Sequence, residues 1–218
     1  ASEIRWFEAG PCYILHLVNC WEEGEWVHQV GCRQADPGYE RDQKDGKLGS
    51  MMAQRRRIHV LYRWSFNMRT GEVREGPIDD LNTEFPTANH NFLGRKSRIS
   101  FNQLIPLAED GSTVGQCQTF DGIVRYDLDT GSSQRFDYGD GVYGNEAPIA
   151  PRRGATRDTP EEAAYAVTFT TDTNDWSSQC LVFDAADISD GPIARVKIPH
   201  RISAGFHTTW VPGEDIFE

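Results

Sequence analysis

The chain has 218 residues, a length that suits either one large domain or two small ones. It carries 22 Lys and Arg residues against 33 Asp and Glu residues, a net charge of -11, and its largest basic cluster is residues 55–57. This pattern predicts no basic surface that could bind along a phosphate backbone, so we expect no nucleic-acid partner. The apolar runs are much shorter than the roughly 20 residues of a membrane-spanning helix, so we expect no transmembrane segment.

The cysteines indicate a reducing compartment. There are five of them, an odd number, and no two form a C-x-x-C pair. This argues against a disulfide framework and against a thiolate zinc site. We therefore predict free cysteines, buried as small hydrophobic residues, in a cytoplasmic protein.

The secondary structure expected along the chain is almost entirely β. Trp6 and Phe7 have the character of strand residues, and since the chain does not begin with Met, we expect that a preceding part of the protein is absent. Three stretches then show the hairpin pattern of a strand, a Gly-containing turn and a second strand: residues 60–73, 123–132 and 180–196. Residues 36–50 and 137–160 are rich in Gly, Pro, Asp and Asn and are predicted to be loops, with one helical turn near residues 158–162.

The hairpins recur at a regular distance. If Tyr62, Tyr126 and Val182 are equivalent, the repeats are 64 and 56 residues long. A loose repeat of this size, made of strands, is typical of β-propeller blades. No linker separates two domains, so residues 1–218 are expected to belong to one all-β domain.

Two of the six histidines have the setting of a metal ligand. No G-x-S-x-G motif, phosphate loop or activated cysteine is present. His16 lies in an apolar strand, and His207 lies between a glycine and large aromatic residues. A buried imidazole needs partners for both nitrogens, and a metal on one with a carboxylate on the other provides them. Glu84 and Glu146, each two residues before a proline, could be these carboxylates or simple turn residues.

The remaining histidines and the aromatic residues have other interpretations. We expect His28 to be a cross-strand or surface residue and both His59 and His200 to be exposed to solvent. His90 follows Glu84 by six positions and could face a substrate. Three aromatic residues flank the proposed metal site and could line an apolar substrate tunnel: Phe85, Phe206 and Trp210.

Six ordered motifs resemble the carotenoid cleavage oxygenase family, which includes lignostilbene dioxygenases and the retinal pigment epithelium isomerase. They are residues 16–19 (H-L-V-N), 84–86 (E-F-P), 125–128 (R-Y-D-L), 146–148 (E-A-P), 184–185 (D-A) and 205–210 (G-F-H-T-T-W). The resemblance covers nearly the whole chain. The sequence departs from the family pattern at Leu15, Asn145, Ala147 and Thr208, all close to the proposed site.

The resemblance implies a fold and a metal site. The family fold is a seven-bladed β-propeller of roughly twice this length, so the chain would be its C-terminal part, about four blades. The family holds one non-haem Fe(2+) with four histidines. His16 and His207 would be the third and fourth ligands, and Glu84 and Glu146 would be two of three acids that orient the imidazoles. The other two histidines and the third acid would belong to the missing N-terminal half of the propeller, without which we expect no independently folded unit.

The resemblance also implies an activity. The protein would be an iron-dependent dioxygenase that uses dioxygen to cleave a conjugated C=C double bond of an apolar alkene, a carotenoid, apocarotenoid or stilbenoid, into two carbonyl products. The alternative is a non-catalytic β-propeller binding scaffold, a relative that has lost its metal. A two-histidine, one-carboxylate oxygenase of another fold is not supported, because no H-x-D/E pattern occurs.

Overall fold

A computed structural model describes residues 3–34, 43–49, 58–109, 119–203, 205–213 and 216. Their regular elements are strands, apart from two short 3-10 helices. The elements are β1 (Tyr13–Glu23), β2 (Trp26–Gln34), η1 (Gln43–Leu48), β3 (Val60–Asn67), β4 (Val73–Pro77), β5 (Thr83–Thr87), η2 (His90–Phe92), β6 (Ile99–Leu104), β7 (Gly122–Asp127), β8 (Ser133–Asp137), β9 (Val142–Gly144), β10 (Ile149–Pro151), β11 (Ala164–Asp172), β12 (Ser178–Asp184) and β13 (Ala194–Ile198). Within the described ranges, no helix has the length and apolar character needed to cross a bilayer.

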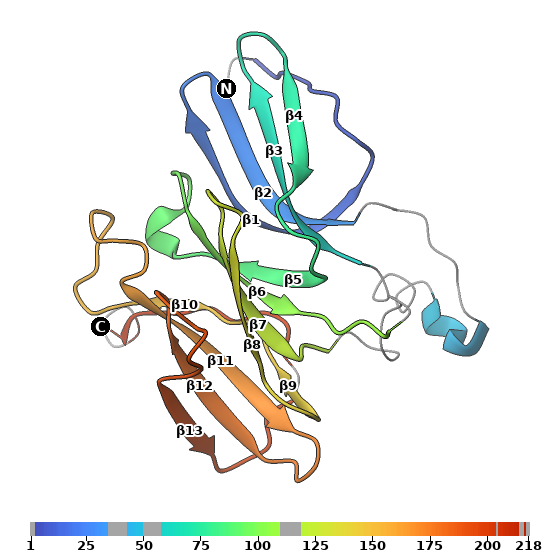
Figure 1. Ribbon diagram of the computed structural model, residues 1–218, viewed down its shortest axis with the longest axis vertical. Helices are drawn as coiled ribbons and strands as arrows, with labels where there is room; N and C mark the ends of the chain where they lie inside the picture. Colours follow the sequence, from blue (N-terminus) through green and yellow to red (C-terminus); the bar gives the residue numbers. More distant parts are fainter. Residues whose placement is uncertain are drawn as a thin grey trace.

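The strands form three antiparallel sheets. The first has the order β1-β2-β3-β4, the second β5-β6-β7-β8, and the third β10-β11-β12-β13 with β9 paired to β11. Figure 1 shows them following one another along the chain, with the second sheet between the other two. Successive four-stranded meanders of this kind are typical of propeller blades. The all-β prediction is confirmed, but the described residues form three such sheets where about four blades were expected.

The three predicted hairpins are the outer pairs of these sheets, β3–β4, β7–β8 and β12–β13. The first two have the same turn. The side-chain oxygen of Asn67 accepts the N–H groups of Arg69 and Thr70, and that of Asp127 accepts those of Asp129 and Thr130. Asn and Asp favour this turn because their side chains replace a backbone acceptor. The equivalent points are therefore 60 residues apart, and the pairing of Tyr62 with Tyr126 was shifted by four positions.

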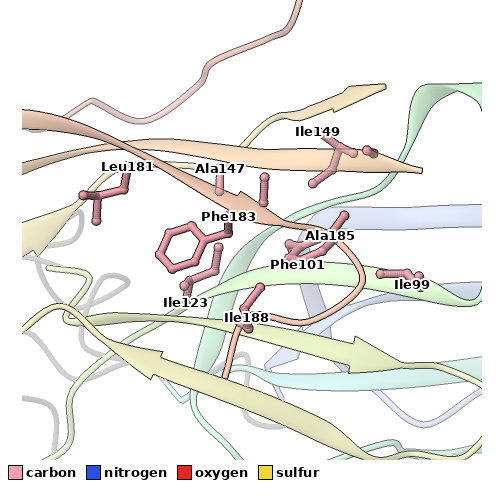
Figure 2. Packing of buried hydrophobic residues seen from close by; sticks show 11 residues of the cluster. Ile99, Phe101, Ile123, Ala147, Ile149, Leu181, Phe183, Ala185 and Ile188 are labelled. Atoms are coloured by element: carbon pink, nitrogen blue, oxygen red, sulfur yellow. The ribbon is translucent and has the colours of Figure 1, made fainter. Parts of the chain in front are cut away.

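Two apolar layers hold the sheets together. Val18, Trp21, Val30 and Leu61 of the first sheet form one cluster with buried residues of the second, among them Tyr126. The other cluster joins the second and third sheets, and Figure 2 shows Phe183 and Ile188 facing Ile123 and Phe101.

The burial pattern follows from this stacking. β6 is buried at every position because its sheet is covered on both faces. β11 alternates between buried and half-buried residues because only one of its faces is covered by a described sheet.

Several local expectations are wrong. Trp6 and Phe7 precede β1 and are not in a strand. The predicted loop at residues 137–160 contains β9 and β10, and residues 158–162 form turns without a helix. Of the four described cysteines, all free, only Cys32 is buried, and Cys20 is exposed; Cys117 lies outside the described residues.

Candidate metal centre

His16 lies on β1 within an irregular part of the strand. The register between β1 and β2 shifts between Ile14 and Leu17 and again between Leu17 and Asn19. Such bulges bend a strand and change the direction of a side chain. Gly31 of β2 leaves room for the irregularity, since a Cβ at this position would lie 2.9 Å from the carbonyl oxygen of His16.

Glu84 supports the His16 ring. This glutamate is fully buried on β5, and its Oε2 lies 2.6 Å from His16 Nδ1. With Glu84 as the acceptor, Nδ1 donates, and in a neutral imidazole the lone pair is then on Nε2. The hydrogen bond to Glu84 raises the pKa of His16 and outweighs the opposite effect of burial. The Phe85 N–H donates to the same carboxylate oxygen, with Phe85 in the left-handed region at φ 52°.

His207 lies in a segment without strands that follows β13. Its side chain is 65% exposed, and its ring centroid is 5.0 Å from that of His16, with the rings edge to face at 74°. Glu146, between β9 and β10, is largely buried, and its Oε1 is 3.6 Å from His207 Nδ1. Its Oε2 accepts the Thr208 N–H at 2.5 Å. Thus an acid lies beside each imidazole, in hydrogen-bond contact with His16 and at a longer distance from His207.

The first strands of the sheets bring these residues together. β1 packs against β5, and Glu146 lies at the corresponding edge of the third sheet, next to β9 and β10. The sequence separations are long, 68 residues between His16 and Glu84, so the site depends on the packing of the sheets.

The Phe85 ring packs against both imidazoles. Its centroid is 4.7 Å from that of His16 and 5.3 Å from that of His207. Two further rings continue this apolar wall, Phe120 at 5.1 Å and Phe206 at 5.7 Å. Phe85 therefore lies beside both imidazoles and Phe206 packs against Phe85, while their assignment to a substrate tunnel stays a prediction.

Trp210 and His90 are not part of this group of rings. Trp210 lines a cavity of about 740 Å³ together with residues of β10, β11 and β12. The side chains of the candidate metal site do not line this cavity. His90 is exposed at the start of η2. Their assignment to a substrate tunnel stays a prediction.

The other histidines agree with expectation except for one. His28 is hydrogen-bonded to Ser65, its cross-strand partner, at 2.8 Å, and His200 is exposed. His59 was expected in solvent but is fully buried, and its ring contacts the side-chain amide of Gln34. The error arose because His59 precedes β3 in a position that the first two sheets enclose.

Sequence reasoning did not find the role of Asn19. Its side-chain nitrogen donates to the carbonyls of Phe92 and Arg95, and its oxygen accepts the N–H groups of Gly94 and Cys20. This buried side chain thereby fixes the strand of His16 to the loop after η2. The H-x-x-N spacing was the only signal in the sequence.

The residues fit one part of a metal site. Nε2 of His16 is available to a ligand, and a second imidazole lies beside it. Neutral imidazoles are ordinary ligands of ferrous iron. Among the residues that the structure describes, however, no group of three or more His, Cys, Asp or Glu side chains could hold a metal ion.

Blade-like sheets that bring two imidazoles and two acids together define an all-β protein of the propeller type with a candidate histidine metal site. The chain matches the family model described as retinal pigment epithelial membrane protein over residues 1–212, and it belongs to this family. This confirms the resemblance drawn from the six motifs.

Known relatives and solved structures are similar to the chain in sequence and in fold, respectively. The chain is 31% identical over 231 residues to carotenoid 9,10(9',10')-cleavage dioxygenase 1 of Phaseolus vulgaris, covering 100% of the chain and 40% of the relative. It aligns with cobalt-substituted apocarotenoid oxygenase of Synechocystis at a TM-score of 0.79 and 19% identity, over 97% of the chain and 42% of the other. With Pseudomonas brassicacearum lignostilbene dioxygenase the TM-score is 0.76 at 25% identity, over 96% of the chain and 44% of the dioxygenase. The chain thus spans about two fifths of the length of these proteins.

Proposed function

We propose that the chain is the C-terminal part of a seven-bladed propeller dioxygenase that cleaves a conjugated C=C bond into two carbonyl products. The observation that carries the proposal is the pair of imidazoles 5.0 Å apart, each with a glutamate beside its Nδ1. The names of the relatives, carotenoid cleavage dioxygenases and a lignostilbene dioxygenase, support the reaction class.

His16 and His207 would hold a ferrous ion through their Nε2 atoms, together with two histidines from the N-terminal half of the propeller. When bound, the iron supplies the means to activate dioxygen. Glu84 keeps the proton of His16 on Nδ1, fixes the plane of the ring and makes Nε2 more basic. Glu146 would do the same for His207 once the 3.6 Å separation shortens. Both carboxylates also offset the charge of a divalent ion among neutral ligands.

An apolar alkene is the substrate class that suits the surroundings. Phe85, Phe120 and Phe206 present a continuous aromatic wall beside the imidazoles and offer no hydrogen-bond donor. Such a wall excludes water and binds a conjugated chain by contact. A carotenoid needs a long apolar channel, whereas a stilbenoid needs a shorter pocket with a polar anchor for a phenol. A cytoplasmic location stays a prediction from the cysteines, and some relatives are described as chloroplastic.

The test uses the full-length protein, purified anaerobically. We expect about one iron per protein and aldehyde formation from an apocarotenoid or a stilbene in a side-by-side panel. His16→Ala and His207→Ala should each lose most of the bound iron and the cleavage, whereas His200→Ala, an exposed control, should keep both. Iron-free protein that cleaves neither substrate would overturn the proposal and support the non-catalytic scaffold.

A further inference from the structure

We propose that Asn145 is a positioning residue for His207, tying the strandless segment that carries this imidazole to the third sheet. The inference rests on the proposed role of His207 as a metal ligand. In this inference Asn145 holds the backbone next to His207, whereas Glu146 lies beside the imidazole ring.

The contacts of the segment point to Asn145. The Gly205 N–H donates to Asn145 Oδ1 at 2.7 Å, two residues before His207. One residue after His207, the Thr208 N–H donates to Glu146 Oε2 at 2.5 Å and its hydroxyl to the Glu146 carbonyl at 3.4 Å. Two consecutive residues therefore hold the backbone on both sides of the imidazole.

A tether restricts motion only if it is itself fixed, and Asn145 is. Its side chain is buried, with the residue 6% exposed. Its N–H donates to the Phe169 carbonyl at 3.0 Å, and its own carbonyl accepts the hydroxyl of Thr168 at 2.8 Å. Thr168 is fully buried in β11, so both backbone groups of Asn145 are attached to a central strand of the third sheet.

The support behind Asn145 extends to the second sheet. Tyr138 packs against the neighbouring backbone, since a Cβ at Gly144 would lie 2.3 Å from its ring. The Tyr138 hydroxyl donates to Gln103 Oε1 at 2.9 Å, and Gln103 is the cross-strand partner of Glu84. A series of contacts thus links the backbone beside Asn145 to the strand partner of Glu84, the acid of His16.

The role needs an acceptor oxygen at position 145. An aspartate has this oxygen, whereas an alanine has none, so the pair of variants isolates the hydrogen bond from the rest of the side chain. Asn174 provides the control: its side-chain nitrogen donates to the Asp140 carbonyl at 3.3 Å in the exposed turn that follows β11.

The experiment compares full-length wild type with Asn145→Ala, Asn145→Asp and Asn174→Ala. Amide hydrogen exchange of residues 205–208 is measured in metal-free protein, and Co(II) affinity is measured by chelator competition together with the visible spectrum. Loss of one hydrogen bond should make Asn145→Ala exchange about 2- to 10-fold faster and bind Co(II) about 2- to 10-fold more weakly. Asn145→Asp should restore wild-type exchange and at least wild-type affinity, and Asn174→Ala should change neither.

Wild-type exchange at residues 205–208 in Asn145→Ala, or failure of Asn145→Asp to restore it, would overturn the inference. If Asn145→Ala does not fold, Thr168→Val tests the same tether by removing the hydroxyl that holds Asn145, and unchanged exchange there would also contradict it. The exchange measurement needs no metal. A wild type that binds no Co(II) would therefore overturn the proposed function, while the tether is judged separately.

Discussion

Replacing Glu84 by glutamine removes the charge behind His16 with little change of shape. In the native protein Oε2 accepts both His16 Nδ1–H, at 2.6 Å, and the Phe85 N–H, while Oε1 is buried with no hydrogen-bond partner among the described residues. In Glu84→Gln the amide oxygen can still accept both donors, but as a neutral group. The amide nitrogen then takes the place of Oε1, where it is a buried donor without a hydrogen-bond partner among the described residues.

The expected loss of metal affinity follows from the change in the charge of the hydrogen-bond acceptor. Glu84→Gln keeps the acceptor but removes its charge, and charged hydrogen bonds are roughly twice as strong as neutral ones. Substitution of a group that supports a metal-bound histidine typically weakens metal binding about 10- to 100-fold. We therefore expect Glu84→Gln to weaken metal binding about 10- to 100-fold. Glu146→Gln should cost less, below about tenfold, because the 3.6 Å separation from His207 is longer than a hydrogen bond and shortening it on metal binding offsets part of the contribution of Glu146.

The assay is chelator competition for Fe(II) or Co(II) in anaerobic full-length protein. Glu72→Gln is a matched control, since Glu72 is exposed and pairs with Arg74 at 2.7 Å in a distant turn. The control should bind metal as the wild type does. Wild-type affinity in Glu84→Gln, or a larger loss in Glu146→Gln than in Glu84→Gln, would refute the reasoning.

Three further predictions concern stability, each measured by denaturant unfolding of the full-length protein. Gly144→Ala places a Cβ 2.3 Å from the Tyr138 ring and should cost about 1–3 kcal/mol, whereas Gly76→Ala, with no atom within 4 Å, should cost far less; equal effects would contradict the packing. Phe85→Ala removes the buried ring that packs against both imidazoles and should cost about 3–5 kcal/mol, against a small change for exposed Trp6→Ala. Burial raises the pKa of Asp127. The N–H groups of Thr130 and Asp129 and the charge of Arg98 together lower this pKa by more than burial raises it, so the net shift is downward. Its stabilising effect is therefore present above the unfolded-state pKa and lost as the pH falls through the folded-state pKa. Asp127→Asn, which makes this turn like that of Asn67, should be destabilising at pH 7 and nearly neutral once the pH lies below the folded-state pKa. A penalty that persists there would count against the role of the charge.

The parts of the fold that sequence predicts best are those with local causes. The turns at Asn67 and Asp127 are set by their own side chains, so the hairpins that they join were expected correctly. Strands β9 and β10 have three residues each and are held by pairing with β11, which no local pattern indicates. The burial of His59 likewise depends on how two sheets meet.

The candidate site divides in the same way. The motifs predicted His16, Glu84, Glu146 and His207, and the structure brings them together as two pairs. The supporting contacts of Asn19 and Asn145 depend on strand register and on the course of the chain after β13, so the sequence alone could not predict them.

The most direct measurement is anomalous diffraction at the iron edge from crystals of the full-length protein, grown without oxygen. We predict a single peak about 2.0–2.2 Å from the Nε2 atoms of both His16 and His207, as expected for imidazole ligands of a divalent metal. A peak bonded to only one of these rings, or a metal held elsewhere while both rings face solvent, would contradict the account.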